Sequence, residues 1–135
     1  MMPPAAYKEA RFRARFHLQV EVVDRGEDGS VRARVKRVFR GHAEITRGDE
    51  VRFAVAVCRP GELVRPGEVF TRLADFNATR YMEVFLNGTP PACCVAASQW
   101  CRLIKGALLF SSLTSRPWMR VPTEKELAAA WEKFP

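Results

Sequence analysis

Alternation of apolar and polar residues is the clearest pattern in the first half of the chain. Over residues 12–22 the even-numbered positions are apolar and the odd-numbered positions are polar. A period of two residues is typical of a strand with one buried face. The same alternation returns over 31–35 and 51–57, after glycine-containing segments that favour turns. The pattern predicts an antiparallel meander of three strands.

The middle of the chain reads as a loop that leads into a hairpin. Pro60-Gly61 and Pro66-Gly67 favour turns, and apolar residues at helical spacing within 69–76 predict a short helix. Residues 81–86 are rich in aromatic and β-branched side chains and lead into Asn87-Gly88, a dipeptide that favours tight turns. We therefore expect 81–86 and 93–104 to pair as a second hairpin.

The end of the chain carries a helix signal. Thr123 and Glu126 form a capping box, in which each side chain satisfies a backbone donor of the other residue. Leu127, Trp131 and Phe134 follow at spacings of four and three residues, which places them on one apolar stripe. A helix this short needs docking to be stable, so we expect a capped helix over 123–134 that packs on the strands.

The order of these elements predicts the fold class. A three-stranded meander, a partly helical connection and a hairpin follow one another as in an OB-type barrel. We expect a mostly β protein: a five-stranded OB-like barrel with a short helical connection between its third and fourth strands and a C-terminal capped helix. With 135 residues the chain is long enough for one hydrophobic core, and we assign residues 1–135 to a single OB-like domain.

The pattern over 31–53 also carries a resemblance. An alternating segment ends at Gly41 and is followed by Gly48-Asp49 at the start of the next strand. In these features the chain resembles the second and third strands of netrin-like and TIMP-like OB domains, which implies an OB-type barrel. Members of that group usually carry N-terminal cysteines that form disulfides and are exported, whereas this chain has no cysteine before Cys58. We therefore carry over the fold and not the inhibitory function of the group.

Charge adds a candidate surface. The chain has 22 Lys and Arg against 15 Asp and Glu, a formal net charge of +7. If apolar residues of the first two strands face inward, the basic residues share one outer face, with Glu21 opposite Arg32 or Arg34 and few other acids nearby. The residues expected on this face are Arg11, Arg13, Arg15, His17, Arg32, Arg34, Lys36 and Arg52. Such a face suits an anionic partner, or it keeps a small β protein soluble.

Candidate chemistry is sparse. The four cysteines show no Cys-x-x-Cys spacing, so we expect neither a metal nor another cofactor, and we interpret the cysteines as small buried hydrophobes. A disulfide involving Cys58 remains an alternative in an oxidising compartment. His17 and His42, the two histidines, have no recognisable catalytic partner. We expect no catalytic residues, although a thiol or histidine enzyme using Cys94 or Cys101 is a third hypothesis.

These observations lead to a ranked set of functions. The leading hypothesis is a non-catalytic binding module that contacts a protein or an anionic ligand through the basic face and the loops around 61–76. The alternative is a single-stranded nucleic-acid-binding protein. Such proteins stack bases on exposed aromatic rings, and here the phenylalanines fall on the inner face, which disfavours this hypothesis. Trp118, in an irregular segment, is a candidate protein contact or a plug for a barrel end. A homo-oligomer is left open.

The chain offers no sequence signal for export or membrane insertion. Its longest apolar runs are far shorter than the roughly 20 residues that cross a bilayer, and its N-terminus lacks the pattern of a secretory signal. We expect no membrane partner and a cytoplasmic location, with an exported protein as the alternative if a leader has been removed.

Overall fold

The computed structural model of the protein describes residues 4–62 and 71–103. In chain order the elements are α1 (Pro4–Arg13), β1 (Phe16–Arg25), β2 (Ser30–Arg40), β3 (Glu50–Ala54), β4 (Val57–Cys58), β5 (Thr71–Arg72), α2 (Leu73–Asn77), β6 (Tyr81–Thr89) and β7 (Ala92–Leu103).

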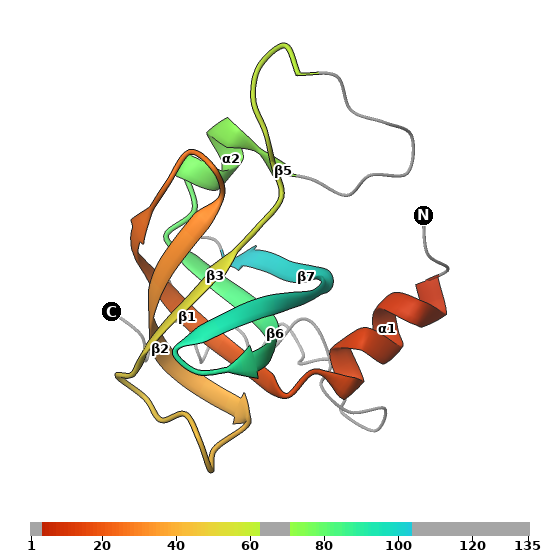
Figure 1. The fold of residues 1–135 in the computed structure, drawn as a ribbon, viewed down its shortest axis with the longest axis vertical. Helices are drawn as coiled ribbons and strands as arrows, with labels where there is room; N and C mark the ends of the chain where they lie inside the picture. The colour runs from red at the N-terminus through yellow and green to blue at the C-terminus, as the bar shows by residue number, and fades with distance from the viewer. Residues whose placement is uncertain (1–3, 63–70, 104–135) are drawn as a thin grey trace, which may run out of the picture.

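Five strands close into a barrel in the order β1-β2-β3-β7-β6 (Figure 1). β1, β2 and β3 form the expected antiparallel meander, and β6 and β7 form the expected hairpin. The barrel closes through a parallel contact between β3 and β7, where Arg52 pairs with Ala92, and through antiparallel pairing of β1 with β6. The prediction of a mostly β protein with a five-stranded OB-like barrel is confirmed.

The inside of the barrel holds the hydrophobic core. The side chains of the main core cluster come from every strand of the barrel except β7, from α2 and from the two loops that flank β3, and partly buried residues of β7 such as Trp100 pack against them. The core residues are Phe16, Leu18, Val20, Val31, Ala33, Val35, Ile45, Val51, Phe53, Val55, Phe76, Met82, Val84 and Leu86. The inward positions of β1 and β2 are those that the alternation predicts.

The first predicted strand begins later than expected. Residues 4–13 form helix α1, so only the part of the 12–22 segment from Phe16 onward is a strand. Alanine, glutamate and arginine favour helix, and proline is well placed at a helix start. Arg40, at the end of β2, donates to the carbonyls of Arg11 (2.9 Å), Phe12 (2.8 Å) and Ala14. This tertiary contact satisfies carbonyls at the helix end that have no intrahelical partner.

Other boundaries also differ from the predicted ones. The third strand ends at Ala54, and β4 forms a separate two-stranded parallel sheet with β5. The helix expected within 69–76 is α2, at Leu73–Asn77, and residues 69–70 lie outside the described residues. In the second hairpin Asn87 and Gly88 pair with β7, and Pro90-Pro91 forms the turn. Two further predictions concern residues outside the described part of the chain. They are the capped helix over 123–134 and the role of Trp118 as a protein contact or a plug for a barrel end.

The two helices lie toward opposite ends of the barrel (Figure 1). α1 leads directly into the start of β1 and contacts β7. α2 lies by the other end of β1, where the Arg25 guanidinium donates to the carbonyl of Phe76 in α2 and stands over the Phe76 ring, 5.5 Å from its centroid. The α2 end of the barrel also contains the turn between β1 and β2.

Candidate anion-binding face

Four of the eight predicted basic residues share the outside of β2 and β3. Arg32 and Arg34 are exposed and alternate with Val31, Ala33 and Val35, which are buried in the core. Lys36 follows on the same strand, and Arg52 of β3 is the direct cross-strand partner of Arg32. We call the set Arg32, Arg34, Lys36 and Arg52 the basic face.

Three carboxylates are interleaved with the basic face, more than the sequence led us to expect. Glu50 bridges two of its arginines, with Oε1 3.1 Å from Arg32 Nη1 and Oε2 3.3 Å from Arg52 Nη2. Asp24 Oδ2 lies 3.8 Å from Arg32 Nη2, because a bulge after Val22 sets Asp24 opposite Arg32. The expectation of few nearby acids was therefore wrong, since strand pairing brings together residues that are distant in sequence.

Glu21 is the third carboxylate, and of its two predicted partners, Arg32 and Arg34, it lies opposite Arg34. Its Oε1 is 3.4 Å from Lys36 Nζ, and its Oε2 is 3.3 Å from Arg80 Nη2. Burial alone raises the pKa of Glu21, but hydrogen bonds and charge from Lys36 and Arg80 outweigh burial and leave the pKa below its usual value. Glu21 is therefore an ionised part of this surface.

Arg34 has the least neutralised charge of the basic face. Within residues 4–62 and 71–103, no carboxylate lies within ion-pair distance of its guanidinium. Its cross-strand neighbours are Glu21 and Glu50, and both carboxylates pair with other cations. A free guanidinium keeps its planar set of donors available for an incoming carboxylate or phosphate.

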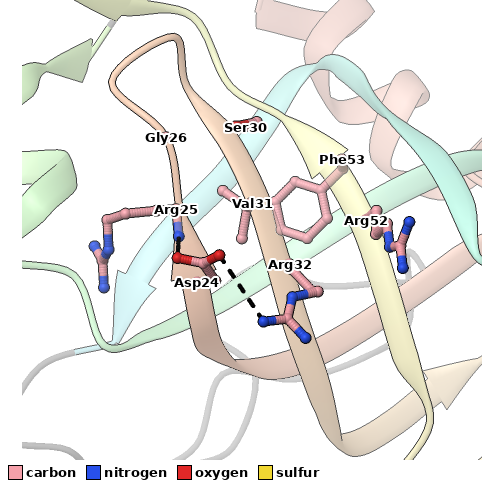
Figure 2. A pocket seen from close by; sticks show the side chains of 8 residues that line it. All are labelled: Asp24, Arg25, Gly26, Ser30, Val31, Arg32, Arg52 and Phe53. Carbon is pink, nitrogen blue, oxygen red and sulfur yellow. Dashed lines mark hydrogen bonds and ion pairs between the residues drawn. The ribbon is translucent and has the colours of Figure 1, made fainter.

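A groove of about 500 Å³ lies at the α2 end of this face. Arginines from three strands line it, with Asp24 between Arg25 and Arg32 (Figure 2). Burial lowers the pKa of Arg25, whose guanidinium is already engaged by the Phe76 carbonyl. The lining residues are Asp24, Arg25, Gly26, Ser30, Val31, Arg32, Arg52 and Phe53. Sequence reasoning missed Arg25, because it follows the bulge and sits next to the turn.

Three other predicted members of the face lie elsewhere. Arg11 and Arg13 belong to α1, where Arg11 donates to Gln99 (2.7 Å) and Arg13 pairs with Glu9 one helical turn away (2.8 Å). Arg15 precedes β1, pairs with Glu44 and donates to the carbonyl of Gly88 (2.8 Å). They leave the predicted face because the chain before Phe16 is helix and link instead of strand.

His17 is also absent from the basic face, because its side chain is fully buried. Its ring stacks between Phe39 and Phe85, with centroids 4.6 and 4.1 Å away. Its Nε2 lies 3.4 Å from Glu83 Oε2, and Gln19 donates to Glu83 Oε1 at 3.0 Å. This buried polar cluster was not predicted, because the alternation treats the odd side of β1 as exposed along its whole length.

The cysteines are less buried than expected. Cys94 is exposed and the other three are half-buried, and all four are free thiols. Cys93 packs against the core while Cys94 faces outward, as their adjacency on a strand predicts. Burial and the neighbouring Cys94 raise the pKa of Cys93, although Arg15 acts in the opposite direction. The raised pKa disfavours the thiolate of Cys93. In the part of the chain that the structure describes, no group of three or more His, Cys, Asp or Glu residues could hold a metal ion.

Comparisons of the chain with models of protein families, with curated proteins and with solved structures find no match. Neither α1 nor α2, the two described helices, has the length and apolar character that crossing a membrane requires.

Proposed function

We propose that the protein is a non-catalytic binding module that contacts a protein or an anionic ligand through the basic face and the adjoining groove. The observation that carries this proposal is that Arg32 and Arg52 line one groove, beside an Arg34 whose charge no described carboxylate neutralises. Guanidinium groups bind carboxylates and phosphates through paired hydrogen bonds, so this arrangement suits an anionic group.

The location of the groove supports the same function. Binding sites are concave, and β-barrels commonly hold them at their mouths. In OB-type barrels, ligands bind on the face of the second and third strands and on neighbouring loops. Here the corresponding strands are β2 and β3, and the groove adjoins the turn between β1 and β2. From the sequence we also expect the loops around 61–76 to contact the ligand. Residues 63–70 of this segment lie outside the described residues.

Two variants with the same change in net charge test the proposal. In the first, Arg32, Arg34 and Arg52 are replaced by serine. In the second, serine replaces Arg13, Arg47 and Arg102, which are exposed on α1, on the loop between β2 and β3 and on β7. Fluorescence anisotropy at low salt measures the binding of labelled polyglutamate and of labelled oligothymidine to the full chain and to both variants.

We expect at least one of the two polyanions to bind the full chain. The first variant should then bind about tenfold or more weakly, and the second should stay within about twofold of the unmodified protein, because each lost contact with a charged group contributes roughly 1 kcal/mol or more. An equal loss in both variants would mean that only net charge matters. That result, or a failure of both probes to bind, would refute the proposed function.

A further inference from the structure

We infer that the occupant of the basic face is an extended acidic segment of a protein partner, with carboxylates at alternate positions. This inference rests on the proposed function and names the ligand class of the same site. It depends on the spacing of the arginines, on the carboxylates between them and on the side chains that surround them.

The spacing of the basic residues matches an extended peptide. Arg32 and Arg34 occupy alternate positions of β2, so their Cα atoms are separated by about 6.6–6.8 Å. Alternate side chains on one face of an extended partner segment repeat at the same distance. A segment with acidic residues at every second position can therefore place one carboxylate near each guanidinium without a change in its backbone.

The arginines are also held in place for such a ligand. Glu50 bonds to both Arg32 and Arg52, and Asp24 lies on the other side of Arg32. The side chains of Arg32 and Arg52 nevertheless remain 44% and 63% exposed, so part of each is open to solvent. Fixing these long side chains before binding reduces the conformational entropy that the complex would lose.

The interleaved carboxylates disfavour a nucleic acid in this position. A phosphodiester chain is negative at every step, so it would meet Glu21, Asp24 and Glu50 as well as the arginines. A peptide can place a neutral or basic side chain opposite each of these acids. The mixed charge of the face therefore suits a polypeptide better than a polyanion of uniform charge.

The side chains around the basic face also disfavour a nucleic acid as the ligand. Proteins that bind single strands without sequence preference stack bases on exposed aromatic rings. Among the described residues every phenylalanine, tyrosine and tryptophan side chain is buried or half-buried. The described part of the face therefore offers no platform for stacking bases, which again favours a polypeptide over a single strand.

Three labelled peptides of equal length test this inference. In the first peptide glutamate alternates with serine, in the second the same glutamates form one continuous block, and in the third glutamine replaces every glutamate. Fluorescence anisotropy measures their affinity for the full chain and for Arg34→Glu, Arg34→Gln and the control Arg13→Glu. Thermal unfolding of each variant confirms that it is folded.

We expect the alternating peptide to bind severalfold more tightly than the block peptide, and the glutamine peptide not to bind. Arg34→Glu should weaken the alternating peptide about tenfold and Arg34→Gln less, while Arg13→Glu has little effect, because a charge reversal removes an attraction and adds a repulsion of similar size. A peptide that alternates lysine with serine should bind Arg34→Glu better than it binds the unmodified protein.

Three results would overturn the inference. If oligothymidine binds at the basic face and no glutamate peptide does, the ligand is a nucleic acid, and the proposed binding function stands while this inference fails. If the alternating and block peptides bind equally and Arg34→Glu has no effect, the extended register is wrong. Failure of every anionic probe would refute both this inference and the proposed function.

Discussion

Two residues of β1 show how burial decides the role of a polar side chain. His17 and Glu21 are four residues apart, both at odd positions. His17 is fully buried between two aromatic rings, and Glu21 lies at the surface between Lys36 and Arg80. A period-two pattern assigns both to the same outer face, because it contains no information on which part of that face another segment covers.

The carboxylate of Glu21 makes stability depend on pH. Its pKa is lowered in the folded protein, so its contribution is present above its unfolded value, near 4.5, and is lost as the pH falls through the folded value. Glu21→Gln should lower the free energy of unfolding by about 1 kcal/mol at pH 7, the size of a surface ion-pair network, and by much less at pH 3. Urea unfolding at the two pH values measures this difference.

A matched control is Glu27→Gln, since Glu27 is 76% exposed and makes one long contact, 4.0 Å, with Arg59. We expect that substitution to change the free energy of unfolding little at either pH. An effect of Glu21→Gln that is as large at pH 3 as at pH 7 would contradict the assigned role of Glu21.

Among the elements, the turns that flank β2 have different packing constraints. Gly29 and Gly48 both have positive φ, 91° and 96°, a region that favours glycine. A Cβ at Gly29 would lie 2.0 Å from the carbonyl oxygen of Val55, whereas a Cβ at Gly48 would meet nothing within 4 Å. The β1–β2 turn is therefore packed against the end of β3, where Val55 also donates to the Gly29 carbonyl (2.9 Å).

Substituting alanine at each glycine separates backbone strain from steric contact. Gly48→Ala should cost about 1 kcal/mol, from the positive φ alone. Gly29→Ala should cost at least about 2 kcal/mol more, because the turn has to move away from β3 and the hydrogen bond from Val55 is lost. Chemical denaturation of the two variants measures both values. Equal losses would mean that the turn is not held against β3.

At the scale of the whole molecule, repulsion within the basic face lowers the free energy of unfolding, and the ion pairs of the face offset this loss. Arg32 and Arg52 are direct cross-strand partners, an arrangement that is destabilising for like charges, and Glu50 offsets the repulsion. The protein has a formal net charge of +7, which adds to repulsion across the barrel. The hydrophobic core, and not this surface, therefore supplies the stability of the fold.

Serine at Arg32, Arg34 and Arg52 together should leave the free energy of unfolding within about 1 kcal/mol of the unmodified protein, or raise it. Thermal and urea unfolding of the variant that loses binding provide the measurement. If this variant instead loses more than about 2 kcal/mol, the arginines hold the barrel together, and a binding role is not needed to explain them.

The local pattern of the sequence determined the barrel. Alternation over 16–22, 31–35 and 51–54 placed the correct side chains in the core, and turn residues separated the strands in the correct order. Hydrophobic burial acts on each strand separately, so a pattern within one segment is enough to predict which face is buried. The same reasoning predicted the Arg32, Arg34, Lys36 and Arg52 part of the face, and it limited the cross-strand partner of Glu21 to Arg32 or Arg34.

Tertiary structure alone decided the rest. Arg-Phe-Arg-Ala-Arg at 11–15 fits a strand or a helix end, and Arg40, more than 20 residues away, caps the helix by bonding to its carbonyls. The bulge before Asp24, the bridging Glu50 and the burial of His17 likewise depend on contacts between segments that are distant in sequence. Hydrogen bonds are short and directional, and an ion pair needs its two charged groups within about 4 Å, so a residue's partners become known only when the strands are in register.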